Sequence, residues 1–169
     1  MSFDNRMRCL RDLKDIGYQT GCGFMVGSPY QTARTLAEDL KFIEEFRPEM
    51  CGIGPFIPQK DTPFRDFPAG TCEQTVYLLS LLRLIQPHLL LPATTALGTI
   101  RPDGRERGLQ AGAIVVMPNL SPLGVRKKYA LYDGKLCTGE EAAQCIGCLS
   151  RRVASVGCRI VTARGDIIR

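Results

Sequence analysis

The feature of this sequence that most constrains its fold is an alternation of short apolar stretches with amphipathic segments. The apolar stretches have the length of β-strands and lie at 22–26, 50–56, 89–93 and 113–117. Between them, apolar residues recur at helical spacing in 32–46 and 73–85, with charged residues on the opposite face. Continuous apolar strands separated by helices predict a parallel sheet whose two faces are both covered. The sequence therefore predicts an α/β fold.

Two further helices are expected in the second half of the chain. One is short, at 101–110, and is ended by Gly112. The other runs over 139–153 and carries Glu140 and Glu141 in its first turn, where the helix dipole favours negative charge.

Two architectures satisfy this alternation, a doubly wound sheet and a closed eight-unit barrel. A doubly wound sheet usually has a glycine-rich turn that leads directly into a helix. The glycines of GCGFMVG (21–27) instead flank and interrupt the strand, and the next turn is Ser28-Pro29. A TIM-type (β/α)8 barrel needs about 250 residues, whereas the pattern contains only four strand–helix units. We therefore predict the carboxyl-terminal half of a barrel at 1–120, followed by a carboxyl-terminal extension at 121–169.

Composition and charge narrow the classes of function. The chain is 44% hydrophobic and 23% charged, which is ordinary for a soluble globular protein. Its longest apolar run, around 89–97, is too short to span a bilayer and contains Pro92. The net charge is +5, and the basic clusters at 126–128 and 151–152 are interpreted as solvated faces. We expect neither a membrane nor a nucleic acid as partner.

The eight cysteines raise the question of disulfides or metal. A disulfide scaffold is typical of shorter secreted domains, and the sequence shows no signal-peptide pattern. We therefore expect a cytoplasmic protein with free thiols. In CTGEEAAQCIGC (137–148), Cys145 and Cys148 lie one helical turn apart and can chelate one ion or cluster edge, while Cys137 closes the site from the preceding loop. Zinc and three metal-free buried thiols are the alternatives to an iron–sulfur cluster.

Functional residues of a barrel lie at the carboxyl ends of its strands. Small, hydroxylic and proline residues gather at those positions here, at 27–29, 55–58, 94–95 and 117–119. Ordinary turns would explain any one of these loops. The adjacent hydroxyls of Thr94 and Thr95, followed by Gly98, predict a cradle for an anion or a polar substrate.

Four motifs carry a more specific resemblance. They are GCGFMVGSPYQT, GIGPFIPQKDTPF, LLPATTALGTI and VVMPNLSPLGVRKKYALYDGKLCTGEEAAQC. Together they resemble the carboxyl-terminal half of the radical S-adenosylmethionine (SAM) maturases of FeFe hydrogenase, the HydE family, which is similar to biotin synthase. The resemblance implies a complete barrel in which a 4Fe-4S cluster cleaves SAM to a 5′-deoxyadenosyl radical. It also implies an organometallic iron–cysteine substrate and other hydrogenase maturation proteins as partners.

The sequence departs from that family in one respect. The family holds its catalytic cluster in a Cys-x3-Cys-x2-Cys loop after the first strand of the barrel, and this sequence has no such spacing. Glu141 stands where Cys145 and Cys148 would need a third cysteine. We therefore expect a truncated chain that lacks the catalytic ligands, and we assign no catalytic residue to it.

The resemblance implies roles for individual residues. Those for SAM, with Arg6 pairing its carboxylate, are Arg6, Gly23, Met25, Gly27, Met50 and Ile57. Those for the substrate are Thr94, Thr95, Met117, Tyr129 and Tyr132. Those for an accessory 2Fe-2S or 4Fe-4S cluster are Cys137, Cys145 and Cys148. Two other functions stay open, namely a different radical SAM enzyme of the biotin synthase type and a non-catalytic iron–sulfur or metal-binding fragment.

Overall fold

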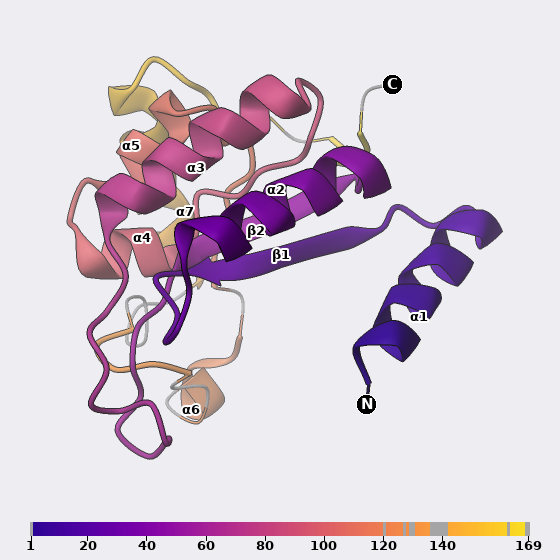
Figure 1. Cartoon of the computed structure of the whole chain (residues 1–169). Coiled ribbons are helices and arrows are strands. Elements are labelled where there is room, and N and C mark those ends of the chain that lie inside the picture. The colour runs from indigo at the N-terminus through magenta and orange to yellow at the C-terminus, as the bar shows by residue number, and fades with distance from the viewer. Residues whose placement is uncertain are drawn as a thin grey trace.

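A computed structural model describes residues 2–119, 121–126, 128, 131–135, 142–161 and 163–167 (Figure 1). The elements in chain order are α1 (Phe3–Ile16), β1 (Gly21–Val26), α2 (Ala33–Phe46), β2 (Met50–Pro55), α3 (Cys72–Ile85), α4 (Thr95–Ile100), α5 (Gly104–Gln110), α6 (Leu123–Arg126) and α7 (Ala142–Ser155). Strands and helices alternate as far as α3, and the α/β prediction is confirmed.

The sheet is parallel, as predicted, but its regular part is smaller. β1 and β2 pair from Gly21 opposite Met50 to Val26 opposite Pro55. The third and fourth predicted strands, 89–93 and 113–117, lie in the expected order and direction but are extended segments joined by single bridges. Pro92 has no N–H to donate to a ladder, which keeps the third segment from forming a continuous strand. The prediction of four strands was right about the position of the third and fourth and wrong about how many of their residues pair in the sheet.

The helices follow local sequence signals. α2 starts after Thr32, whose hydroxyl accepts a hydrogen bond from the Thr35 backbone in a reciprocal capping box. The helices predicted at 32–46 and 73–85 are confirmed as α2 and α3. The short helix predicted at 101–110 is confirmed as α5, which begins at Gly104, and the short helix before it, α4, was not predicted.

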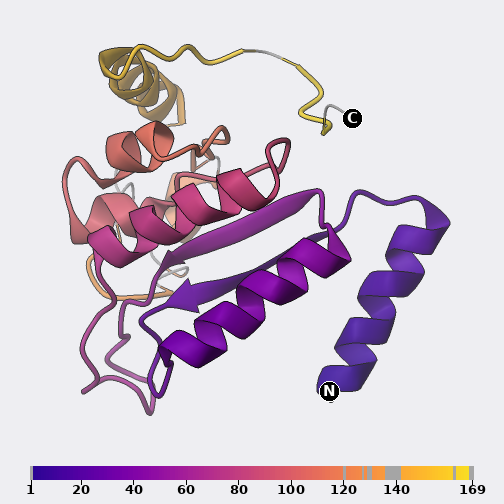
Figure 2. The ribbon, with the colours of Figure 1, turned by 45° about the horizontal axis from the view of Figure 1, so that its top comes forward.

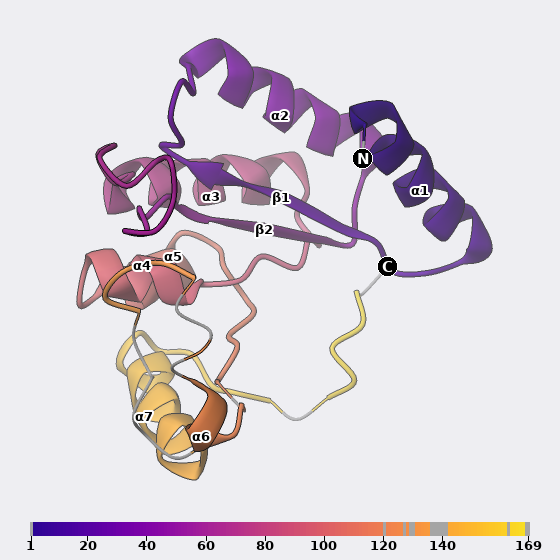
Figure 3. The ribbon, with the colours of Figure 1, turned by 90° about the horizontal axis from the view of Figure 1, so that it is seen from below.

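The core lies between the strands and the helices that cover one of their faces. Ile53 of β2 is fully buried with Leu79 and Leu82 of α3 and Ile43 of α2. Figure 2 shows α2 and α3 along the two strands, with α1 set apart beyond the start of β1. Figure 3 shows α4, α5 and α7 following in succession on the side away from α2. This arrangement is that of a partial barrel.

The carboxyl-terminal extension is docked on α5. Arg152 of α7 donates two hydrogen bonds to the carboxylate of Glu106, each 2.7 Å long. Leu149 and Val153 of α7 are buried. The interpretation of 151–152 as a purely solvated face is therefore wrong for Arg152, whereas the domain boundary near residue 120 stays a prediction. No helix within the described part of the chain is long and apolar enough to cross a membrane.

Candidate functional site

Three of the residues predicted for SAM share the face of the strands that points away from α2 and α3. Burial alternates along β1 and β2, and the residues that pack toward α2 and α3 are Val26, Cys51 and Ile53. Gly23, Met25 and Met50 occupy the alternate positions, and Met25 is 58% exposed. We call this face, which points away from α2 and α3, the inner face of β1 and β2. It carries few side chains, because glycines occupy four of its six positions.

Two glycines predicted for SAM also have a packing reason. A Cβ atom on Gly23 would lie 1.9 Å from the carbonyl oxygen of Gly52 in β2. A Cβ atom on Gly27, whose φ is 78°, would lie 2.5 Å from the Cα atom of Gly70. Close backbone contact therefore requires glycine at both positions whether or not a cofactor lies above them. Their role toward SAM stays a prediction.

The loop that follows β2 folds back onto the end of β1. The Phe56 amide donates to the Val26 carbonyl, and the Gly70 amide donates to the Phe56 carbonyl, each over 2.8 Å. Within the loop, Phe64 makes edge contacts with Phe56 and Phe67, at ring-centroid distances of 6.5 and 5.5 Å. Ile57 is half-buried at the start of this loop. The sequence reasoning missed this aromatic cluster, for which the spacing of phenylalanines in 56–67 was the available signal.

The two threonines predicted for substrate lie where the third segment ends and α4 begins. The Thr94 hydroxyl is buried and has no hydrogen-bond partner among the residues that the structure describes. It does not cap α4, and a Cβ atom on Gly54 would lie 2.7 Å from its oxygen. Thr94 therefore projects over the inner face of β2. Thr95 accepts a hydrogen bond of 3.0 Å from Nη2 of Arg105.

Arg105 is a site residue that sequence reasoning missed. It lies on α5 and is only 8% exposed. Gly104 and Gly108, four residues apart, are also buried and mark the face of α5 that packs closely. Arg107 stands beside Gly108 just as Arg105 stands beside Gly104, so no local signal in the sequence could have located Arg105.

The segment that carries Tyr132 approaches the same region. The amide of Asp133 donates to the carbonyl of Pro58, at 3.2 Å, in the loop after β2. A Cβ atom on Gly134 would lie 3.9 Å from the Thr99 methyl group in α4. Tyr132 lies in a bend. Tyr129 itself lies outside the described residues.

Met117, the remaining residue predicted for substrate, follows the fourth extended segment. It is 56% exposed. The segment before it is held in place by Val115, whose carbonyl accepts a hydrogen bond from the Ala93 amide, at 2.9 Å, next to Thr94. The structure therefore brings Met117 and the two threonines to the same edge of the sheet.

Arg6 lies on a cleft that is separate from the region around Thr94 and Thr95. It borders a cleft of about 680 Å³ between α1 and the pair β1 and α2, together with Gly23 and Cys22. Met25, Gly27, Met50 and Ile57 are not among the residues that line this cleft. The structure thus joins Arg6 to one of the residues predicted for SAM, leaves Met25, Gly27 and Ile57 at the carboxyl ends of the strands, and places Met50 at the amino end of β2.

The predicted accessory cluster falls largely outside the described residues. Cys137 lies outside them, and so does the side chain of Cys145, although its backbone belongs to α7. Cys148 is a half-buried free thiol on α7. In the described part of the chain, no three histidine, cysteine or acidic side chains come close enough to hold a metal ion. The cluster stays a prediction.

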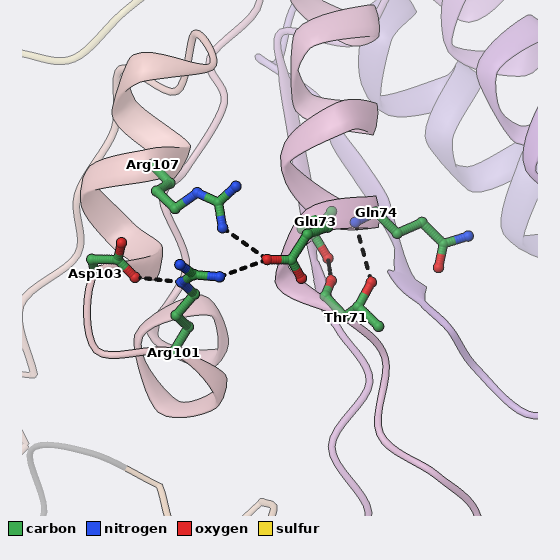
Figure 4. Close-up of polar contacts among 7 residues, drawn as sticks. Thr71, Glu73, Gln74, Arg101, Asp103 and Arg107 are labelled. Atoms are coloured by element: carbon green, nitrogen blue, oxygen red, sulfur yellow. Dashed lines mark hydrogen bonds and ion pairs between the residues drawn. The ribbon is translucent and has the colours of Figure 1, made fainter.

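An ion network joins α3 to α5 and to the segment between α4 and α5 (Figure 4). The Glu73 carboxylate accepts hydrogen bonds from Arg101 and Arg107, at 2.7 and 2.8 Å. Arg101 also donates to Asp103, at 2.7 Å. The hydrogen bond from Arg107 holds the pKa of Glu73 below its ordinary value.

Comparison with known proteins decides the relationship. No family model matches the chain. The chain is 46% identical, over 156 residues, to the FeFe hydrogenase maturase subunit HydE of Thermotoga maritima, an alignment that covers 92% of this chain and 45% of that protein. The resemblance to the carboxyl-terminal half of HydE is confirmed.

This chain is also similar to methylornithine synthases. Over the same length the chain is 31% identical to 3-methylornithine synthase of Methanosarcina barkeri, covering 43% of that protein. The fold matches the crystal structure of methylornithine synthase (PylB) with a TM-score of 0.74 and 26% identity, over 96% of this chain and 46% of that one. The chain spans about half the length of HydE and of the other curated relatives it matches.

Proposed function

We propose that this chain forms the substrate-side half of a radical SAM enzyme that acts in the cytoplasm on FeFe hydrogenase maturation. The observation that carries the proposal is the identity of 46% to HydE over nearly the whole chain. The open inner face of the strands, which ends at Thr94 and Thr95, supports it. The expected substrate is an organometallic iron–cysteine complex, and other maturation proteins are the expected partners.

Gly27 and Ile57, at the carboxyl ends of the strands, and Arg6 with Gly23, on the cleft beside α1, are the residues that we infer to hold SAM. A Cβ atom on Gly54 would occupy the space under the Thr94 hydroxyl, so glycine keeps a cradle open there. Arg6 offers an exposed guanidinium for a carboxylate on the cleft that it shares with Gly23. When bound, SAM and its 4Fe-4S cluster supply a 5′-deoxyadenosyl radical. The sequence contains no Cys-x3-Cys-x2-Cys spacing, so it offers no matching ligands for that catalytic cluster.

The task of this half would be to bind and orient. Thr94 places its hydroxyl over the inner face of β2, and the next residue, Thr95, adds a second hydroxyl that Arg105 contacts. A polar substrate group can accept or donate hydrogen bonds there. Tyr132 and Met117 come to the same edge from the segments that follow. Gly23 and Gly52 keep side chains off the face on which a ligand would lie.

A second candidate is an enzyme that rearranges an amino acid, similar to 3-methylornithine synthase. Identity of 31% over the same length supports it. The higher identity to HydE favours hydrogenase maturation. A non-catalytic metal-binding role is supported by none of the described residues.

The test uses the enzyme in which this chain is joined to an amino-terminal half that carries the Cys-x3-Cys-x2-Cys loop. Thr95→Val and Tyr132→Phe should impair hydrogenase activation while SAM binding and 5′-deoxyadenosine formation without substrate stay intact. Tyr77→Phe, an exposed position on α3, is the matched control. Loss of SAM binding in the Thr95 or Tyr132 variant, with activation by bound substrate preserved, would show that the substrate side is wrongly assigned.

A further inference from the structure

Arg105 is a buried cation with no carboxylate partner among the residues that the structure describes. Its side chain is on the closely packed face of α5, where the residue is 8% exposed. Nη2 donates to the Thr95 hydroxyl, and Nε is buried with no acceptor among the residues that the structure describes. Burying a charge without a counter-ion is unfavourable, so the position of Arg105 calls for an explanation.

The acidic residues of the neighbouring helices form ion pairs with other arginines. Glu73 binds Arg101 and Arg107, as Figure 4 shows. The other two carboxylates of the α4–α5 region are also paired, Asp103 with Arg101 and Glu106 with Arg152. Within the described part of the chain, the positive charge of Arg105 therefore has no protein carboxylate to balance it.

The one hydrogen bond that Arg105 makes has a consequence for Thr95. A guanidinium only donates, so the Thr95 oxygen must accept, and its own proton is free to point elsewhere. The neighbouring Thr94 hydroxyl is buried and also without a partner among the described residues. Two adjacent hydroxyls beside an unbalanced positive charge favour a negatively charged acceptor over a neutral or cationic group.

We propose that Arg105 is a positioning residue that fixes the Thr95 hydroxyl as a hydrogen-bond donor toward a carboxylate group bound at Thr94 and Thr95. Arg105 acts through Thr95 and supplies the balancing charge without touching the ligand. The inference rests on the proposed function only in placing a substrate group at the two threonines.

We call this arrangement, in which Arg105 orients Thr95 and Thr95 donates to the carboxylate, the relay. Acetate is the probe that tests it, and acetamide is the neutral counterpart of acetate. The measurement is the dissociation constant of each compound for the full 169-residue chain, from thermal-shift titrations at fixed pH and ionic strength. Acetate should stabilise the chain and acetamide should not. Arg105→Met and Thr95→Val should each weaken acetate binding by at least about tenfold, the usual effect of losing one charge-assisted hydrogen bond.

Two matched variants separate the relay from general effects. Arg107→Met removes an arginine from the same helix that is paired with Glu73 and should leave acetate binding unchanged. Thr95→Ser keeps the hydroxyl and should bind acetate as the unmodified chain does. If Arg105→Met fails to fold, Arg105→Lys takes its place, because it retains the charge and removes the guanidinium geometry that orients Thr95.

The inference is overturned by any of three results. These are equal stabilisation by acetate and acetamide, unchanged acetate affinity in the Arg105 variants, and an Arg107→Met effect as large as that of Arg105→Met. SAM plays no part in these titrations. A failed maturation assay with the acetate dependence intact would therefore reject the proposed function and leave the relay standing.

Discussion

Cys22 of β1 and Cys51 of β2 are direct neighbours across the parallel strands, on the face that the helices cover. Cys51 is fully buried, whereas Cys22 is half-buried and borders the cleft beside α1. A hydrogen bond from the Cys51 thiol lowers the pKa of Cys22. The same contact, together with burial, raises the pKa of Cys51. The pair is therefore chemically unequal.

This inequality predicts the order in which the two thiols react. In the folded chain at neutral pH, iodoacetamide should modify Cys22 well before Cys51, because the thiolate is the reactive form and Cys22 is the accessible one. Peptide mass spectrometry over a time course measures both rates. Exposed Cys9 and Cys158 give the reference rate. Equal modification of Cys51 and Cys22 under native conditions would contradict the structure.

Gly70 is predicted to be intolerant of any side chain. A Cβ atom there would lie 2.0 Å from the Val26 carbonyl oxygen, so the loop after β2 would have to move off the end of β1. Gly70→Ala should lower the free energy of unfolding by about 1–3 kcal/mol, as overpacking typically does. Urea denaturation measures the change. Gly124→Ala is the control, since a Cβ atom on Gly124 meets no described atom within 4 Å. An equal loss in both variants would refute the close contact.

Glu49 is predicted to make stability depend on pH. It is buried and accepts hydrogen bonds from the amide and hydroxyl of Thr20, at 2.8 and 2.9 Å, with the Lys14 ammonium at 3.5 Å. Burial by itself raises the pKa of this carboxyl, but the bonds from Thr20 and the charge of Lys14 outweigh it and lower the pKa. A lowered pKa in the folded state stabilises the protein above the unfolded value of about 4.3, and this contribution is lost as the pH falls through the folded value.

Glu49→Gln isolates that contribution. The variant should be less stable than the unmodified chain near neutral pH, and the difference should shrink below roughly pH 4, where Glu49 becomes protonated and resembles glutamine. Chemical denaturation at a series of pH values measures the two curves. A difference in unfolding free energy that stays constant from acid to neutral pH would rule out Glu49 as the source.

The three cysteines of the carboxyl-terminal motif are predicted to act together. Anaerobic reconstitution with iron and sulfide should give a visible chromophore that is lost when Cys137, Cys145 or Cys148 is replaced, because thiolates are the usual ligands of iron–sulfur clusters. Cys72→Ala should leave the chromophore unchanged, since Cys72 is buried at the start of α3. Stoichiometric zinc with no retained iron would instead indicate a structural metal site.

Sequence pattern predicted those parts of the fold that depend on neighbours along the chain. The helices at α2 and α3 and the order of the four extended segments follow from periodicity and capping residues such as Thr32. Hydrophobic pattern alone overestimated the length of the third strand, because it does not register that Pro92 lacks the N–H needed for a continuous ladder. It also missed α4, because this helix has only six residues and the contact that packs α5 against it, between Gly104 and the Leu97 carbonyl, is tertiary.

The two threonines of the candidate site could be predicted from the sequence, whereas the buried arginine that contacts one of them could not. Thr94 and Thr95 stand out as adjacent threonines at a strand end. Arg105 stands among other arginines in a charged stretch, and nothing in the local sequence separates it from Arg101 or Arg107. Only the packing of α5 on α4 buries one of the three and leaves its neighbours in the ion network with Glu73.

Arg83 shows how the opposite end of the sheet differs from this one. Its guanidinium donates to the carbonyls of Pro87, Leu89 and Gly112, at 2.6 to 2.9 Å, where the third and fourth extended segments begin. These hydrogen bonds tie α3 to the amino ends of the third and fourth extended segments, whereas Thr94 and Thr95 lie at the carboxyl end of the third. Mutations near Thr95 can then accumulate over generations without loosening the contacts of Arg83. A half-barrel divided in this way can diverge in what it binds while it keeps the same architecture.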